Sequence, residues 1–139
     1  AKAPFLLDCM LHVPCLIYAP NNQNDITYDD LIESVDLFPT LANLAELAPP
    51  DCVQGKILPP FDTTESYHRR EVVYAEAVDK KCLRTKEWKL IHNLTPNTWE
   101  LYNLENDPKE LKNVVEDFPA IVTKLKEKLK QIIDECDSD

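Results

Sequence analysis

Few residues in this chain have a type and spacing that could do chemistry. Cys9, His12 and Cys15 have the spacing of half a metal-binding knuckle. A structural zinc ion needs four tetrahedral ligands, and the sequence holds no second ligand pair. On a strand, the two cysteines would also project opposite to the histidine. We therefore interpret these cysteines as buried thiols beside a buried strand, and we expect no metal ligands in the chain.

No catalytic nucleophile stands out either. Ser34 and Ser66 lack the G-x-S-x-G turn of serine hydrolases. His68 and His92 have no acid or cysteine at a spacing that would mark them as catalytic. We expect His68 to lie in a solvated loop and His92 to end a strand. Because the chain has one glycine, Gly55, a glycine-rich phosphate loop is excluded.

The remaining polar features have simple structural interpretations. Asp29, Asp30 and Glu33 form a carboxylate cluster, which is typical of the polar approach to a helix. Asn93 begins a formal glycosylation sequon that a following proline weakens. Lys2 stands near the first residue, where a lysine is usually part of a frayed end. Residue types alone therefore assign no side chain to catalysis.

The charge balance limits the partners that the chain can bind. Its 139 residues include 25 acidic and 15 basic side chains, a formal net charge of −10 at pH 7. An acidic surface repels phosphate backbones, so we expect no nucleic-acid partner. The longest uncharged apolar run, residues 9–19, is about half of the roughly 20 residues that span a bilayer, so we expect no membrane partner.

The apolar pattern of the first half predicts one strand and one helix. Residues 12–19 form a short continuous apolar run, which is typical of a strand buried on both faces of a parallel sheet. From Asp36 to about Ala48, apolar side chains recur at three- and four-residue steps. This spacing predicts a helix that Asp36 caps and that two prolines end, before a loop over residues 49–70.

The second half predicts an antiparallel sheet and a final amphipathic helix. Short apolar segments with tight connections indicate a meander. These segments are residues 71–78, 81–84, 88–92 and 99–103. After Asp117, apolar residues trace one helical stripe. The stripe consists of Phe118, Ile121, Val122, Leu125, Leu129, Ile132, Ile133 and Cys136. An antiparallel sheet has a face to cover, so we expect this stripe to pack on it.

Five blocks of the chain resemble segments of the sulfatase family, in the same order and at similar spacing. Three lie in the first half: residues 2–17 resemble K-G-x-x-x-Y-E-x-x-x-R-V-P-x-I-I, residues 35–41 resemble V-D-L-x-P-T-L, and residues 54–59 resemble G-x-S-L-x-P. Residues 83–91 resemble the R-T-x-x-Y-K-L-I hairpin. Residues 100–114 resemble E-L-Y-D-L-x-x-D-P-x-E-x-x-N-L. The first block departs from the motif at Ala3, Leu7, Asp8 and His12.

The chain is thus similar to the C-terminal part of a sulfatase, within the alkaline phosphatase superfamily. The resemblance implies that residues 1–48 are the last strand and helix of the large α/β domain and that residues 49–70 are a linker loop. Residues 71–139 would be the small antiparallel-sheet subdomain with its final helix. The implied fold class is α/β, the end of an alkaline-phosphatase-like sheet, with an α+β C-terminal part.

The resemblance also implies a chemistry. The family hydrolyses sulfate esters with a formylglycine, made from the first residue of C/S-x-P-x-R, and with a divalent cation, usually calcium. This chain has no such motif, and we expect it to begin after the segments that hold the cation. Only Lys2 matches an active-site residue of the family, the lysine whose ammonium contacts the sulfate. A point charge on a flexible stem suits that role. We expect the chain alone to be inactive.

Two other interpretations stay open. A phosphate or phosphonate ester hydrolase of the same superfamily would share this C-terminal architecture. A standalone acidic interaction module would need no nucleophile at all. If the chain is a C-terminal fragment, residues 1–48 leave apolar surface unmatched. We then expect missing N-terminal sequence, or another chain, to cover these residues.

Overall fold

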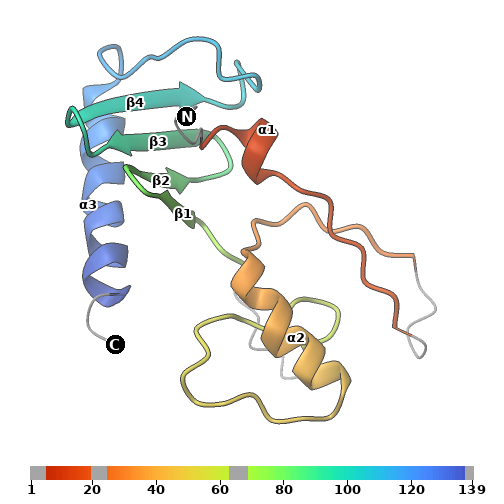
Figure 1. The fold of residues 1–139 in the computed structure, drawn as a ribbon. Coiled ribbons are helices and arrows are strands. Elements are labelled where there is room, and N and C mark those ends of the chain that lie inside the picture. Colours follow the sequence, from red (N-terminus) through yellow and green to blue (C-terminus); the bar gives the residue numbers. More distant parts are fainter. Residues whose placement is uncertain (1–5, 20–24, 63–68, 137–139) are drawn as a thin grey trace. The chain divides into compact units, whose positions relative to one another are not determined.

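The computed structural model describes residues 6–19, 25–62 and 69–136 (Figure 1). The chain divides into two compact units. One unit joins the residues up to Pro14 with those from Val72 onward, and the other consists of residues 15–71. These boundaries differ from the predicted division after residues 48 and 70, because residues 6–14 pack with the second half of the chain.

The first unit is built on a four-stranded antiparallel sheet in the order β1-β2-β3-β4. The strands are β1 (Val73–Ala77), β2 (Lys80–Arg84), β3 (Trp88–Asn93) and β4 (Thr98–Asn103). Neighbours in sequence are neighbours in the sheet, so the predicted meander is confirmed. Short turns between strands of alternating pattern favour this topology.

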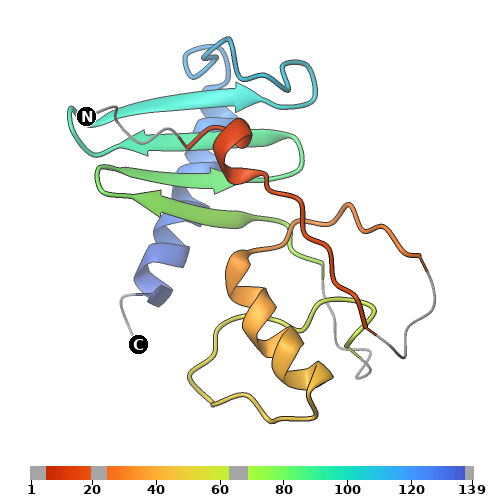
Figure 2. The same ribbon diagram turned by 45° about the vertical axis from the view of Figure 1, so that its right-hand side comes forward.

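One face of the sheet packs against helix α3 (Pro119–Cys136), as Figure 2 shows. The helix contributes buried Val122, Leu125 and Leu129 to a core that also contains three leucines of the sheet. These are Leu83, Leu90 and Leu101. The predicted packing of the amphipathic stripe is therefore confirmed, and Pro119 begins the helix, where a proline costs no hydrogen bond.

The opposite face of the sheet is covered by residues 6–11, which include the short helix α1 (Asp8–Leu11). Its apolar cluster consists of Leu6, Cys82, Ile91, Tyr102 and Leu104. Among the cysteines only Cys82 is buried, and burial raises the pKa of its thiol to about 12. Our expectation of buried thiols was therefore wrong for Cys9 and Cys15, which are exposed.

The strand predicted over residues 12–19 does not form. These residues have no regular secondary structure, and Val13, Leu16 and Tyr18 are 70%, 95% and 88% exposed. A strand is stable only when its backbone groups pair with a neighbour. In the described part of the chain the sheet consists of β1–β4 and an isolated bridge joins Leu31 and Arg70, so residues 12–19 have no strand partner. That this segment belongs to the sheet of a larger α/β domain stays a prediction.

The second unit contains the 3-10 helix η1 (Ser34–Asp36) and helix α2 (Leu37–Leu44). Asp36 occupies the N-cap position of α2, as predicted, but its backbone is helical and its side chain makes no capping hydrogen bond to that helix. Its buried carboxylate accepts hydrogen bonds from the backbone N–H groups of Glu33 (2.9 Å) and Lys56 (2.8 Å) and pairs with Arg70. Asp36 therefore links η1 to the loop that follows α2.

Helix α2 ends four residues earlier than predicted. The Glu46 N–H bonds to the Asn43 carbonyl and the Leu47 N–H to the Ala42 carbonyl, with Glu46 at a φ of 57°. This is the Schellman motif, which closes a helix before any proline is reached. In the loop that follows, a side chain at Gly55 would meet the Val35 carbonyl oxygen at 2.0 Å, so glycine is required there. Within the described ranges, no helix is long and apolar enough to cross a membrane.

The α3 interface can be tested with a core truncation. Leu125→Ala should lower the free energy of unfolding by about 2–5 kcal/mol, because it removes buried methyl groups and leaves a cavity. Urea titration followed by the fluorescence of Trp88 and Trp99 measures this change. Leu111→Ala, at a leucine that is 82% exposed, is the control and should stay within about 0.5 kcal/mol of the parent chain. Equal effects of the two substitutions would contradict the packing.

Candidate functional site

Those of the residues singled out from the sequence that the structure describes do not gather into one site. Lys2, Ser66 and His68 lie outside the described residues. Among the residues that are described, no three His, Cys, Asp or Glu side chains gather as a metal site would require. In the carboxylate cluster of the second unit, Asp30 pairs with Arg69 at 3.4 Å and Glu33 with Arg70 at 2.9 Å.

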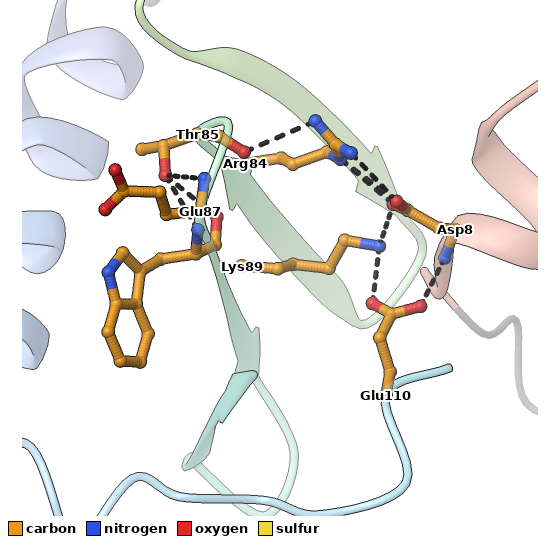
Figure 3. Close-up of polar contacts among 7 residues, drawn as sticks. Asp8, Arg84, Thr85, Glu87, Lys89 and Glu110 are labelled. Carbon is orange, nitrogen blue, oxygen red and sulfur yellow. Dashed lines mark hydrogen bonds and ion pairs between the residues drawn. The ribbon is translucent and has the colours of Figure 1, made fainter. Parts of the chain in front are cut away.

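The main polar feature of the first unit is a cluster of four charged side chains: Asp8, Arg84, Lys89 and Glu110, here called the ion cluster (Figure 3). Asp8 begins α1, Arg84 ends β2, Lys89 lies in β3, and Glu110 lies in the loop after β4. The Lys89 side chain is fully buried, and the Glu110 side chain is 2% exposed. Segments more than 100 residues apart in the sequence therefore meet at one buried cation.

The contacts within the ion cluster are short, and those of the Lys89 ammonium are ion pairs by distance rather than aligned hydrogen bonds. The Lys89 ammonium lies 2.6 Å from Glu110 Oε1 and also pairs with Asp8 Oδ1. The Arg84 guanidinium binds the same aspartate, with its Nε 3.1 Å from each carboxylate oxygen and its Nη2 3.0 Å from Oδ2. The Asp8 backbone N–H donates to Glu110 Oε2 at 2.6 Å. Two cations thus face two carboxylates, and their charges cancel.

The ion cluster changes the acidity of Asp8. Burial by itself would raise the pKa of its carboxyl, but hydrogen bonds from Arg84, the short contact with the Lys89 ammonium and the charges of both hold the pKa below its ordinary value of 3.8. The carboxylate therefore keeps its charge under ordinary conditions. Such a paired, charged group is suited to holding structure rather than to exchanging protons with a substrate.

Local structure places each member of the ion cluster. Strand alternation puts Lys89 on the sheet face opposite α3, next to Arg84 on β2 and Tyr102 on β4. In the β2–β3 turn, the Thr85 hydroxyl oxygen accepts the N–H groups of Glu87 (3.3 Å) and Trp88 (2.9 Å), as Figure 3 shows. Glu110 has a φ of 55°, and its N–H bonds to the Asp107 carbonyl.

Sequence reasoning did not find the ion cluster, although a signal was present. Asp8, Arg84, Lys89 and Glu110 each stand at a charged letter of the sulfatase-like blocks: the E of Y-E, the R of R-T, the K of Y-K and the E of D-P-x-E. Lys89 also stands in an apolar run with Trp88, Leu90 and Ile91, and such a run is typical of a strand that is buried on both faces. A charge inside such a run requires a partner, but the spacing does not say which one.

A surface hollow of about 540 Å3 opens beside the ion cluster. Its lining residues are Asp8, Cys9, His12, Arg84, Lys86, Leu104, Pro108, Lys109 and Glu110. Without counting His12, the lining has three cations and two carboxylates, an excess of one positive charge, on a chain whose net charge is −10. The hollow is open to solvent, and its excess of positive charge favours an anionic group over a cationic one.

A second polar group on the same sheet face explains the sequon residue. The side chain of Asn93 is buried and donates to Glu100 Oε1 at 2.8 Å, and Glu100 in turn accepts the Tyr102 hydroxyl at 2.7 Å. Burial, followed by this hydrogen bond, raises the pKa of Tyr102. Asn93 thus has a structural role in the sheet.

His92 is the last residue but one of β3, which ends at Asn93 and not at His92 as predicted, and it stacks on Trp99, with ring centroids 3.8 Å apart. The Lys126 ammonium lies 4.2 Å from the centroid of the Trp99 ring. The Nε2 atom of His92 lies 2.8 Å from Asn97 Oδ1. Each of these contacts holds the β3–β4 hairpin or α3, which gives His92 a structural environment.

Residues 3–135 match the family model described as N-sulphoglucosamine sulphohydrolase, C-terminal. The chain belongs to this sulfatase family. Its four-stranded antiparallel sheet with covering helices is the arrangement found in sulfatase C-terminal parts, so the predicted mixed α/β class is confirmed.

Individual relatives support the same assignment. Arylsulfatase K of Danio rerio is 30% identical, in a match that covers 88% of this chain and 26% of that protein. The uncharacterized sulfatase YidJ of Escherichia coli is 25% identical, over 96% of this chain and 28% of its own length. The chain thus spans about a quarter of the curated relatives that it matches.

Solved structures give the corresponding fold similarity. A 2-O GAG sulfatase has a TM-score of 0.62 and 27% identity, covering 72% of this chain and 24% of that one. A protein solved in complex with its substrate D-glucosamine-2-N,6-O-disulfate has a TM-score of 0.54 and 27% identity, over 74% of this chain and 23% of its own. Both similarities make the chain a C-terminal sulfatase part.

Because Lys89 is buried between two carboxylates, we expect its removal to destabilise the fold strongly. Lys89→Met should lower the free energy of unfolding by about 3–5 kcal/mol, because it leaves the carboxylates of Asp8 and Glu110 buried without their shared cation. Urea titration measures the change. Lys112→Met, at a side chain that is 76% exposed, is the matched control and should have almost no effect. A Lys89→Met chain as stable as the control would show that the ion cluster is not buried in solution.

The lowered pKa of Asp8 predicts a pH dependence. Because the folded chain holds this carboxyl below 3.8, the unfolded chain binds the proton more readily. The stabilisation is complete above pH 3.8 and is lost as the pH falls through the folded pKa. The free energy of unfolding should therefore fall less steeply below about pH 4 in Asp8→Asn than in the parent chain. Urea titrations at several pH values measure this slope. Glu105→Gln, at an exposed side chain, is the control and should leave the slope of the parent chain unchanged.

Proposed function

We propose that the chain is the C-terminal part of a sulfuric ester hydrolase in which Lys2 contacts the sulfate group of the substrate. The match of the sulfatase C-terminal family over residues 3–135 supports the hydrolase class, and the resemblance of residues 2–17 to the first sulfatase block supports the role of Lys2. The relatives described above are sulfatases, which favours sulfate over phosphate or phosphonate esters as the substrate. Both structural neighbours are described with sulfated sugar substrates, so a sulfated saccharide is the first substrate class to test.

The proposed role of Lys2 follows from its chemistry and its position in the motif. It stands at the lysine of the first sulfatase-like block, in register with Val13 and Pro14. A protonated ammonium beside sulfate oxygens stabilises the negative charge that the leaving alkoxide and the sulfate carry in the transition state. Lysine suits a single-point contact of this kind.

The nucleophile and the cation are proposed to belong to other sequence of the intact enzyme. The chain contains no C/S-x-P-x-R motif, and its described residues do not form a cluster that fits calcium. In the family, formylglycine supplies the attacking oxygen and calcium neutralises charge on the sulfate. We therefore propose that the 139-residue chain is inactive by itself.

We also propose that preceding sequence of the intact enzyme covers the apolar surface of residues 1–48. The exposed large side chains of this region include Val13, Leu16, Tyr18, Phe38 and Leu41. Exposed apolar area of this extent is typical of a surface that another part of the protein covers. The relatives are about four times as long as the matched region, which leaves enough chain for this partner. In the alternative, in which the chain is a standalone interaction module, another chain covers this apolar surface.

Steady-state kinetics test the proposal. In the enzyme that contains this chain, Lys2→Ala should lower kcat/KM for an aryl sulfate by about 10²–10³-fold, the usual cost of removing one charge-stabilising donor. Exposed Lys112→Ala is the matched control and should leave kcat/KM unchanged. The isolated chain, with calcium and the same substrate, should show no turnover.

Three results would contradict the proposal. Sulfatase turnover by the isolated chain, abolished by Lys2→Ala, would place a whole active site within these 139 residues. Turnover of a phosphate or phosphonate ester, without turnover of the sulfate, would favour the sister hydrolases. A full-length natural protein that begins at Ala1 and binds another chain would favour the interaction module.

A further inference from the structure

We propose that residues 6–11, here called the strap, open from the sheet as a unit of their own while β1–β4 and α3 stay folded, and that the charge of Asp8 keeps the strap closed. The inference concerns contacts between described residues of the first unit, so it does not depend on the proposed function. It gives the ion cluster a second role beside stability, which is the control of a local opening. A strap held in this way is the first part of the unit to leave when that charge is lost.

The strap has little apolar hold on the sheet. Helix α1 has four residues, and none of them is buried. A helix of one turn has no stability of its own, because nucleation costs more than a single turn returns. Leu6, which is 5% exposed, is the buried apolar anchor, while Leu7 and Leu11 pack only in part. The strongest remaining contacts are those of Asp8.

The strap is not part of the strand pairing. The sheet of the described chain consists of β1–β4, and the N–H groups of Met10 and Leu11 bond to the Leu7 carbonyl within the strap. Within the described ranges, the strap's backbone makes one hydrogen bond to the rest of the unit, from the Asp8 N–H to Glu110 Oε2 at 2.6 Å. Opening of the strap therefore breaks no hydrogen bond between strands.

The sheet keeps its larger apolar core when the strap is open. Its other face packs Leu83, Leu90 and Leu101 against α3, and no residue of the strap belongs to that core. An antiparallel sheet with one covered face is a common arrangement. A local opening that leaves this core buried costs less free energy than global unfolding.

Opening also leaves no buried charge without a partner. Lys89 keeps Glu110, 2.6 Å away, since neither residue belongs to the strap. In the closed state the Lys89 ammonium also contacts Asp8, and water takes that place once the strap has left. The opening therefore avoids the free-energy cost of an unpaired buried ion.

The charge of Asp8 decides how firmly the strap is held. Its carboxylate pairs with Arg84 of β2 and with Lys89 of β3. The other titratable side chains around it come from the strap and its end, from β2 and the turn after it, and from the loop after β4. They are Cys9, His12, Cys82, Lys86, Lys109 and Glu110. Since Glu110 is the one carboxylate among them, a surplus of positive charge holds Asp8.

Acid should open the strap before it unfolds the sheet. Burial raises the pKa of the Asp8 carboxyl, but the contacts with Arg84 and Lys89 outweigh it and hold the pKa below 3.8. In the open state the carboxyl lies in water and binds a proton more readily. The charge therefore holds the strap fully above pH 3.8, and this hold is lost as the pH falls through the pKa of the closed state.

Cys82, which lies beneath the strap, reports the opening. It is 1% exposed and packs in the apolar cluster that contains Leu6. Burial raises the pKa of its thiol to about 12, so the closed chain protects this thiol from alkylation. The other four cysteines are exposed and are replaced by serine for the measurement: Cys9, Cys15, Cys52 and Cys136. Cys82 then reacts only through an opened state.

Alkylation of this single-cysteine chain by iodoacetamide at neutral pH tests the strap. Asp8→Asn should speed the labelling of Cys82 by about 10–100-fold, the effect of losing hydrogen bonds to a charged group. Asp8→Glu should label more slowly than Asp8→Asn, because it keeps the carboxylate. Asp117→Asn, which breaks an exposed ion pair with Lys112, is the matched control and should leave the rate unchanged.

Val122→Ala separates strap opening from global unfolding. Val122 is buried in α3, in the core on the opposite face of the sheet, so its truncation destabilises the whole unit without touching the strap. If the strap opens by itself, Val122→Ala should leave the labelling rate of Cys82 unchanged.

Hydrogen exchange of the same chains locates the opening. Asp8→Asn should speed amide exchange in residues 6–12, while peptides from β3 and α3 keep the exchange rates of the parent. In the parent chain, a fall of the pH below 3.8 should remove the protection of residues 6–12 before that of β3 and α3.

Faster labelling in Asp8→Asn, with unchanged exchange in β3 and α3, would support the strap. Two results would overturn it. Labelling that rises in Val122→Ala and Asp8→Asn alike, in proportion to their loss of stability, would mean that Cys82 is reached only by global unfolding. An unchanged rate in Asp8→Asn would mean that this charge does not hold the strap.

A second variant decides the question if Asp8→Asn does not fold. Arg84→Gln removes one of the two cations and leaves Asp8 paired with Lys89. Faster labelling of Cys82 in this variant, with unchanged exchange in α3, would support the strap, and the labelling rate of the parent would overturn it.

Discussion

The first unit depends on one buried cation. The Lys89 side chain is fully buried, and a charge removed from water is tolerated only beside groups that neutralise it. Glu110 and Asp8 supply the carboxylates, and Arg84 neutralises the charge of Asp8. Because these partners come from α1, β2 and the loop after β4, the requirement to neutralise one ammonium organises three separate segments around the sheet.

Different kinds of interaction stabilise the two faces of the sheet. Strand alternation places Leu90 on the face that α3 covers, where the contacts are apolar and non-directional. The same alternation places Lys89 and Ile91 on the opposite face, which combines a small apolar cluster with the ion cluster. The helix face therefore holds the larger of the two apolar clusters, while the directional contacts of the other face specify where residues 6–11 lie.

This division fits a C-terminal sulfatase part. A subdomain of this size needs one apolar face to fold, and α3 provides it. Its other face holds residues 6–11, and the charged positions of three sulfatase-like blocks meet there as Asp8, Arg84, Lys89 and Glu110. The blocks that identify the family thus include structural contacts. Exposed Leu16 and Tyr18 show that the described units do not bury all of their apolar surface.

The sequence by itself determined the elements whose pattern is local. The β1–β4 meander, α3 and its buried Leu125 follow from apolar periods of two and 3.6 residues and from short connections, which act within a few residues. It also determined the family, since the order of five blocks needs no coordinates. Only the tertiary structure decided how residues 12–19 lie, because a strand requires a partner that local pattern cannot supply. It alone decided that Asp36 links η1 to the loop near Lys56, and that Asp8 meets Lys89 and Glu110. Those contacts join residues far apart in the chain, and a charge pattern does not say which opposite charge will lie beside it once the sheet has formed.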